Sequence, residues 1–137
     1  MSIPYRFPLL AAGIFGATGV GFGAFGAHAL RGALTELGTR DRWETAVLYQ
    51  LTHSVALLGV AAFLHSVSGA TARRALWAAR CWATGIVLFS GSLYVMSVTS
   101  TAPLWFKIAV PPLGGSSFVL GWLCIAASAL AHRDPNP

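Results

Sequence analysis

Three polar side chains capable of hydrogen bonding lie close together inside an otherwise apolar stretch of this chain: Tyr49, Gln50 and His53. His53 follows the other two by four and three residues, which places all three on one face of a helix. Ser90 and Tyr94 form a second polar stripe with similar spacing. Polar groups at membrane depth usually face the protein interior and hydrogen-bond between helices. The pattern favours a structural network, and a path for protons or solutes along Tyr49, Gln50 and His53 is the alternative.

Two histidines, His28 and His53, are of a metal- or haem-ligating type and could approach each other. On adjacent helices His53 would lie roughly 13–15 Å deeper than His28, at 1.5 Å per residue. Haem ligation by two histidines needs both rings at one depth, so this pair fits it poorly. We therefore predict no metal and no cofactor. A quinone- or lipid-binding role that uses both histidines is a further alternative.

The sequence lacks the common catalytic motifs. It contains neither G-x-S-x-G nor H-E-x-x-H, and all four carboxylates lie outside the apolar segments. Gly21-x-Gly23-x-x-Gly26 matches the dinucleotide-binding pattern. That pattern binds phosphate only between a strand and the start of a helix, whereas here it lies within an apolar segment. We predict that the protein is not an enzyme.

The elements that must position these residues are indicated by the distribution of charge. Charged residues make up 9 % of the 137 residues, against about 25 % in a soluble domain. Four stretches of 24 to 28 residues carry no charge, and about 20 apolar residues suffice to span a bilayer. The sequence predicts a single integral membrane domain over residues 1–137, all-α, folded as a four-helix transmembrane bundle. We place its helices at about 8–30, 43–65, 76–98 and 112–131.

The connections between these helices are short. Between the first two helices we expect a short interfacial helix near 32–37 and a turn at Gly38. Asp41 followed by Glu44 has the spacing of a capping box, which predicts that the second helix begins there. Pro111-Pro112 favours the first turn of the last helix, where a missing N–H has no cost.

Glycine is unusually frequent in the apolar segments, and 15 of the 137 residues are glycine. In lipid, small residues let neighbouring helix backbones approach closely, and Gly19-x-x-x-Gly23 has the GxxxG spacing of such contacts. The glycines expected to pack between helices are Gly16, Gly19, Gly23, Gly26, Gly91, Gly115 and Gly121.

The net charge of +5 does not indicate nucleic-acid binding. The basic residues flank the apolar segments, where they anchor helices and set topology. We expect the partners to be the lipid bilayer and other copies of the chain or other membrane subunits, with no nucleic acid.

The chain resembles the transmembrane-protein-256-like family of small membrane proteins, a domain-of-unknown-function family with bacterial inner-membrane members. The resemblance covers nearly the whole chain. Its motifs are Gly23-Ala24-Phe25-Gly26-Ala27-His28-Ala29-Leu30, Trp43-Glu44-Thr45-Ala46 with Tyr49-Gln50 and His53, Leu88-Phe89-Ser90-Gly91-Ser92-Leu93-Tyr94, and Pro112-Leu113-Gly114-Gly115 with Phe118 and Gly121-Trp122.

The resemblance implies a four-helix integral protein of a bacterial inner (plasma) membrane and no particular activity, cofactor or substrate. The motifs contain most of the polar residues, and we hypothesise that these form one cluster beside the first two helices. Its members would be His28, Trp43, Glu44, Tyr49, Gln50, His53, Ser90 and Tyr94. We expect a structural or accessory subunit that packs in an oligomer or a larger membrane complex.

Overall fold

The computed structural model describes residues 5–131, and this part of the chain is a bundle of helices without strands. In order along the chain the helices are α1 (Arg6–Ala27), α2 (Arg31–Glu36), α3 (Arg40–Phe63), α4 (Gly69–Gly85), the π-helix η1 (Ile86–Ser90), α5 (Gly91–Val98) and α6 (Leu104–Ala131). Because α4, η1 and α5 are continuous, the bundle has four helices long and apolar enough to cross a membrane. The predicted all-α four-helix transmembrane bundle is confirmed.

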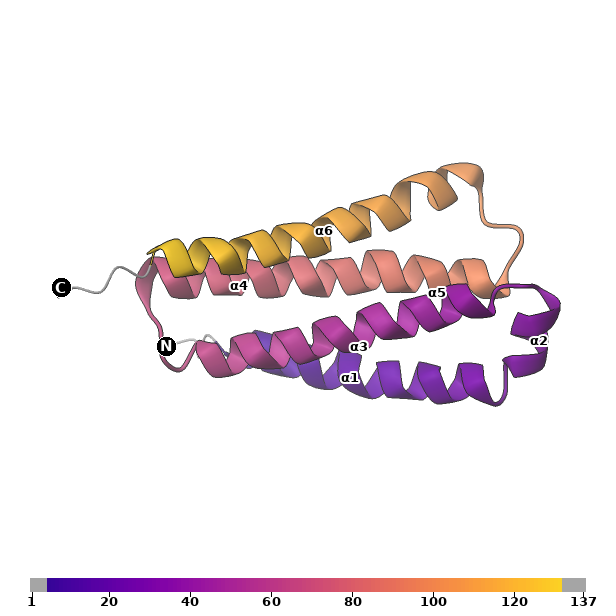
Figure 1. Cartoon of the computed structure of the whole chain (residues 1–137), viewed down its shortest axis with the longest axis horizontal. Helices are drawn as coiled ribbons and strands as arrows, with labels where there is room; N and C mark the ends of the chain where they lie inside the picture. The colour runs from indigo at the N-terminus through magenta and orange to yellow at the C-terminus, as the bar shows by residue number, and fades with distance from the viewer. Residues whose placement is uncertain (1–4, 132–137) are drawn as a thin grey trace.

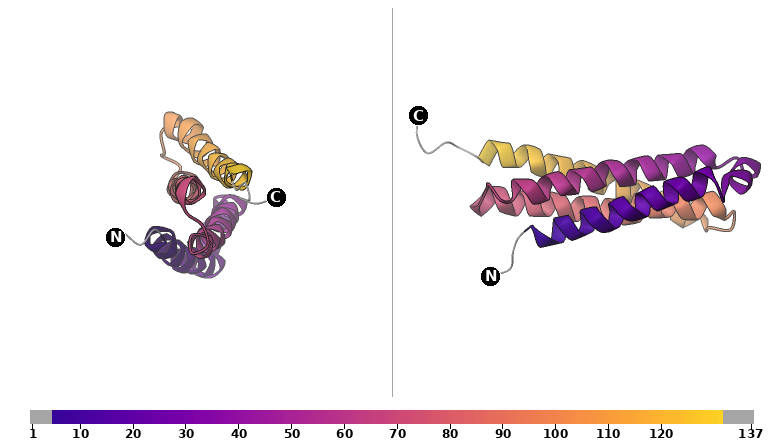
Figure 2. Two further views of the ribbon diagram at one scale, coloured as in Figure 1. Left: turned by 90° about the vertical axis from the view of Figure 1, so that its left-hand side faces the viewer. Right: turned by 90° about the horizontal axis from the view of Figure 1, so that it is seen from below.

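The four long helices form two antiparallel pairs, α1 with α3 and α4 with α6 (Figure 1). The pairs meet mainly where α3 packs against η1 and α5. Seen from the end, α1 and α6 lie on opposite sides of the bundle (Figure 2). The short helix predicted between the first two long ones is α2, which lies at the end of the bundle opposite the start of α1 (Figure 1).

The last two long helices begin seven and eight residues earlier than the apolar pattern predicts. The third starts at Gly69 and not near 76, and Arg74 within its second turn donates from Nη1 to the Ala127 carbonyl at 2.7 Å. The predicted start of the fourth at 112 is wrong, because α6 begins at Leu104 and contains Pro111 and Pro112. Neighbouring helices make interior prolines tolerable in membrane helices. The length of an apolar segment therefore does not fix where a helix begins, because a helix can start before its apolar segment.

The start of α3 also differs from the prediction. The chain turns at Gly38, as expected, with a left-handed φ of +64°. The helix then begins at Arg40 with Thr39 as the N-cap, so Asp41 and Glu44 do not form the expected capping box. The Glu44 carboxylate instead accepts from Arg40 Nε at 2.8 Å.

Aromatic rings resting on glycine hold the helices of each pair close together. In the first pair, Gly26 of α1 lies under the indole of Trp43 in α3. In the second pair, Gly121 lies under Trp82, and Gly85 lies under Phe118. A Cβ at any of these three glycines would overlap the ring.

The predicted packing glycines differ in how closely they are approached. A Cβ at Gly19 would meet Leu51, and one at Gly23 would lie 3.4 Å from Val47. At Gly16 and Gly115 the nearest side-chain atom would be 4.0 Å away, and at Gly91 none within residues 5–131 would be nearer than 4 Å. Gly85 and Gly114, which are not among the predicted packing glycines, are tightly packed, and the backbone of Phe89 lies against Gly114.

We predict that Gly26→Ala destabilises the protein by about 1–3 kcal/mol, the usual cost of overpacking. The added methyl group would displace the Trp43 indole, which donates from Nε1 to the Phe22 carbonyl at 2.9 Å. Thermal unfolding in mild detergent, followed by circular dichroism, measures the change. Gly59→Ala is the matched control, because a Cβ there has open space, and an equal loss in both variants would contradict the prediction.

Candidate functional site

Gln50 is the centre of a hydrogen-bond network that joins three helices. Its amide Nε2 donates to the Phe15 carbonyl at 2.9 Å and to Thr18 Oγ1 at 2.8 Å, both in α1. Its Oε1 accepts from the Tyr94 hydroxyl of α5 at 2.9 Å. Only 3 % of Gln50 is exposed. We call Phe15, Thr18, Gln50 and Tyr94 the Gln50 network, and its bonds satisfy both the NH₂ group and the carbonyl oxygen of one buried amide.

Trp43 closes this network toward the end of the bundle that carries α2. Its ring lies 4.7 Å from the Tyr94 ring and 6.1 Å, edge-on, from Phe22. The side chain is buried, and its only polar atom is bonded to Phe22 as described above. Trp43 therefore separates Gln50 and Tyr94 from the polar residues at the start of α3.

His53 lies in a second, separate cluster that joins α3 to α4 and α6. Its ring stacks on Phe118 with centroids 3.7 Å apart and a 14° angle between planes. Trp82 and Trp122 lie 6.2 Å and 6.1 Å from it. We call His53, Trp82, Phe118 and Trp122 the His53 aromatic cluster.

Both ring nitrogens of His53 are engaged. Nδ1 lies 2.8 Å from the Tyr49 carbonyl, which can only accept, so Nδ1 carries the proton. Nε2 then accepts from Trp122 Nε1–H at 3.3 Å. No nitrogen of this ring is left to bind a metal or receive a proton without breaking a contact.

The structure brings some of the eight predicted cluster residues together and leaves others apart. Trp43, Gln50 and Tyr94 form one group, whereas His53 packs on α4 and α6. Tyr49 is 40 % exposed, with its ring 4.7 Å from Phe89. Its ring is also 6.0 Å from the His53 ring and 5.8 Å from the Phe118 ring. Two residues of the α3 stripe therefore meet at Phe118, whereas Gln50 bonds to α1 and α5.

The remaining predicted residues lie at the ends or alone. His28 and Glu44 are exposed at the end of the bundle near α2. His28 caps α1, whereas His53 is 13 residues into α3, so the two are separated along the bundle by about 20 Å. Ser90, in the π-helix, is fully buried, and its Oγ has no hydrogen-bond partner within residues 5–131.

The predicted cluster did not include four side chains that build these two groups: Thr18, Trp82, Phe118 and Trp122. Thr18 is an isolated hydroxyl in the first charge-free stretch, and Phe118 and Trp122 are four residues apart on one helical face. The spacing of these residues is visible in the sequence, but no short sequence pattern indicates that the helix face of Phe118 and Trp122 packs against His53. No group of three His, Cys, Asp or Glu residues in the described range could hold a metal ion.

The fold and these clusters define a class: a small membrane protein of four spans whose interior polar groups bind mainly one another. Comparison with known proteins identifies the family. A family model described as "Protein of unknown function (DUF423)" matches residues 22–115, and the chain belongs to this family.

Curated relatives match most of the chain. It is 40 % identical to the UPF0382 membrane protein YwdK of Bacillus subtilis over 114 residues, covering 82 % of this chain and 87 % of the relative. It is 39 % identical to the UPF0382 inner membrane protein YgdD of Escherichia coli over 132 residues, covering 91 % and 90 %. No solved structure matches. These names and the four spans confirm the predicted integral, bacterial inner-membrane location.

We predict that Tyr94→Phe lowers the free energy of unfolding by about 1 kcal/mol, the size of one interhelical hydrogen bond in a membrane protein. The change removes the only donor to Gln50 Oε1 within residues 5–131. Unfolding in bicelles measures the loss. Tyr49→Phe is the control, since the Tyr49 hydroxyl makes no hydrogen bond in the same range; a loss of equal size there would contradict the assignment.

Proposed function

We propose that this protein is a non-catalytic membrane subunit that self-associates through the outer face of α1. The observation that carries the proposal is a second stripe of small residues on this helix: Gly13, Ala17 and Gly21, each four residues from the next. All three are exposed, and a Cβ at Gly13 or Gly21 would meet nothing within 4 Å in the described part of the chain.

The two small-residue faces of α1 have different surroundings. Gly19, Gly23 and Gly26 face α3, as described above. The stripe of Gly13, Ala17 and Gly21 points away from the bundle, and a groove of about 590 Å³ lies along its first half, lined by Arg6, Leu9, Leu10, Gly13, Ile14 and Ala17. Lipid chains do not drive apolar helices together, so close backbone contact across small residues is a principal source of association.

The arrangement inside the bundle supports a structural role over a carrier. A polar path needs groups that are free to bind a solute or exchange a proton. Gln50 and His53 are instead engaged by neighbouring side chains and carbonyls. His53 does not line any of four well-formed surface grooves on residues 5–131.

The alternative of a quinone or lipid held between His28 and His53 has less support. The two histidines are separated along the bundle, and the aromatic ring of Phe118 occupies one face of His53. The proposal of a structural subunit uses neither residue as a ligand.

We predict that Ala17→Leu weakens self-association about tenfold or more, a change that ~1.4 kcal/mol produces. A leucine in the middle of the stripe would hold the two helix backbones apart. Single-molecule photobleaching in liposomes, over a range of protein densities, gives the dimer fraction. Ala126→Leu is the control, because Ala126 is also exposed but lies on α6.

Two results would overturn the self-association proposal. A wild-type protein that stays monomeric at every density would contradict self-association. The other result is co-purification of a different membrane protein in a fixed ratio, with its release by Ala17→Leu. That result would show that α1 binds an unlike partner, and it would overturn the self-association proposal.

A further inference from the structure

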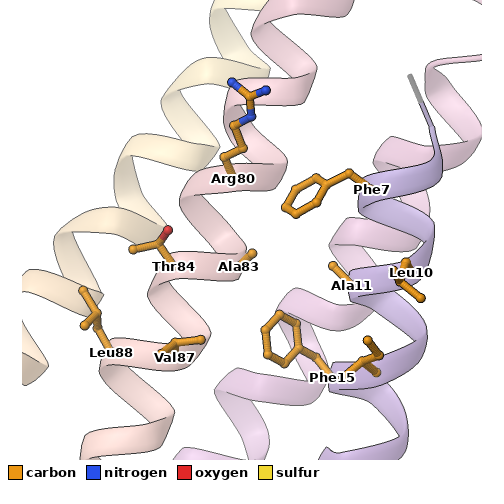
Figure 3. A pocket seen from close by; sticks show the side chains of 10 residues that line it. Phe7, Leu10, Ala11, Phe15, Arg80, Ala83, Thr84, Val87 and Leu88 are labelled. Atoms are coloured by element: carbon orange, nitrogen blue, oxygen red, sulfur yellow. The ribbon is translucent and has the colours of Figure 1, made fainter. Parts of the chain in front are cut away.

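A groove of about 510 Å³ separates the two helix pairs between α1 and α4 (Figure 3). These helices belong to different pairs and contact each other sparsely. Phe7, Leu10 and Ile14 of α1 form one wall, and Val87 and Leu88 lie in the other. Several of these side chains are largely exposed, including Leu10 at 65 % and Val87 at 59 %. The groove is a lipid-facing surface of the bundle.

One charged side chain, Arg80, lies at one end of this apolar groove. Its guanidinium carbon is 5.2 Å from the centroid of the Trp77 ring. Figure 3 shows the guanidinium pointing away from Thr84 and Leu88, past Phe7. The ion pair found within residues 5–131 is Arg40 with Glu44, so no described carboxylate neutralises Arg80.

In its own helix, Arg80 marks the end of the apolar segment. It is the last charged residue before the charge-free stretch 81–106. From Arg80, the groove extends eight residues along the helix to Leu88, about 12 Å at 1.5 Å per residue. A cation at the rim and apolar walls below it match the two ends of a phospholipid molecule.

We infer that this groove binds an anionic phospholipid, with the phosphate on the Arg80 guanidinium and one acyl chain along Leu10, Ile14 and Val87. A guanidinium recognises phosphate oxygens in a bidentate manner, and stacking on Trp77 orients it. Arg6 lies at the start of α1, at the same end of the bundle, and adds positive potential there. We therefore expect the groove to bind a lipid of net negative charge more tightly than a zwitterionic lipid. This inference does not rest on self-association, although Leu10 and Ile14 line both grooves.

Native mass spectrometry of the delipidated protein, titrated with phosphatidylglycerol or phosphatidylcholine, tests the inference. We expect the wild type to prefer phosphatidylglycerol, and Arg80→Gln to reduce that preference about fivefold, the effect of one basic group near the surface. Arg73→Gln is the matched control, because Arg73 is exposed on the same helix but does not line the groove. It should change the preference less than about twofold.

A second variant tests the apolar part of the groove. Thr84 is exposed and lines it, so Thr84→Phe fills the space without repacking the core. We expect weaker binding of the first molecule of either lipid, with circular dichroism unchanged. Equal binding of the two lipids by the wild type, or equal losses in Arg80→Gln and Arg73→Gln, would overturn the inference. Dimers that only Thr84→Phe abolishes, with lipid preference intact, would assign the groove to a second copy and also overturn it.

Discussion

The bundle depends on close contact between rings and glycine backbone. For an apolar helix, contact with lipid is as favourable as contact with another apolar helix. Burial of apolar surface alone therefore cannot hold four such helices in a fixed arrangement. Trp43 on Gly26 fixes α1 against α3, and Trp82 on Gly121 fixes α4 against α6. Each ring occupies the volume that a Cβ would take, which brings the axes near enough for dispersion contacts along the whole pair. Each ring thereby holds the two helices of its pair close together.

Polar contacts then join the pairs. The Gln50 network connects α3 to α1 and α5, and the His53 aromatic cluster connects α3 to α4 and α6. The π-helix η1 contributes to this division of contacts. Its wider turn inserts a residue, which rotates the following positions by about 100° relative to a continuous α-helix. The residues of α4 pack on α6, whereas Tyr94 and Ser97 in α5 bond to α3 and its N-cap.

The contrast between interior and exterior is the basis of the functional proposal. Inside, the Gln50 amide and the His53 imidazole are engaged by neighbouring groups, and aromatic rings fill the space beside them. Outside, α1 exposes Gly13 and Gly21, and the groove between α1 and α4 has Arg80 at one end. Chemistry directed at lipid and at neighbouring helices is therefore on the surface, which suits a protein that acts by assembly in the membrane.

The sequence alone determined the number of spans, the all-α class, the short helix between the first two spans and the family. These follow from local properties: transfer of an apolar segment into lipid depends on its own length and charge, and the family motifs are contiguous. Helix ends were less predictable: α4 starts before its apolar segment, where Arg74 bonds to α6, and α6 continues through the Pro111-Pro112 pair. The candidate site was predicted only in part: Gln50 and Tyr94 meet, but His53 turns to α6 and His28 lies apart.

Only the tertiary structure decided which face of each helix meets which neighbour. In α1, Gly19 and Gly21 are equivalent by residue type, yet one packs on Leu51 and the other faces outward. The groove at Arg80 lies between α1 and α4, which are distant in the chain. The physical reason is that helix packing in lipid is decided by shape and hydrogen bonds between residues far apart in sequence, and neither is encoded in the hydropathy of a single segment.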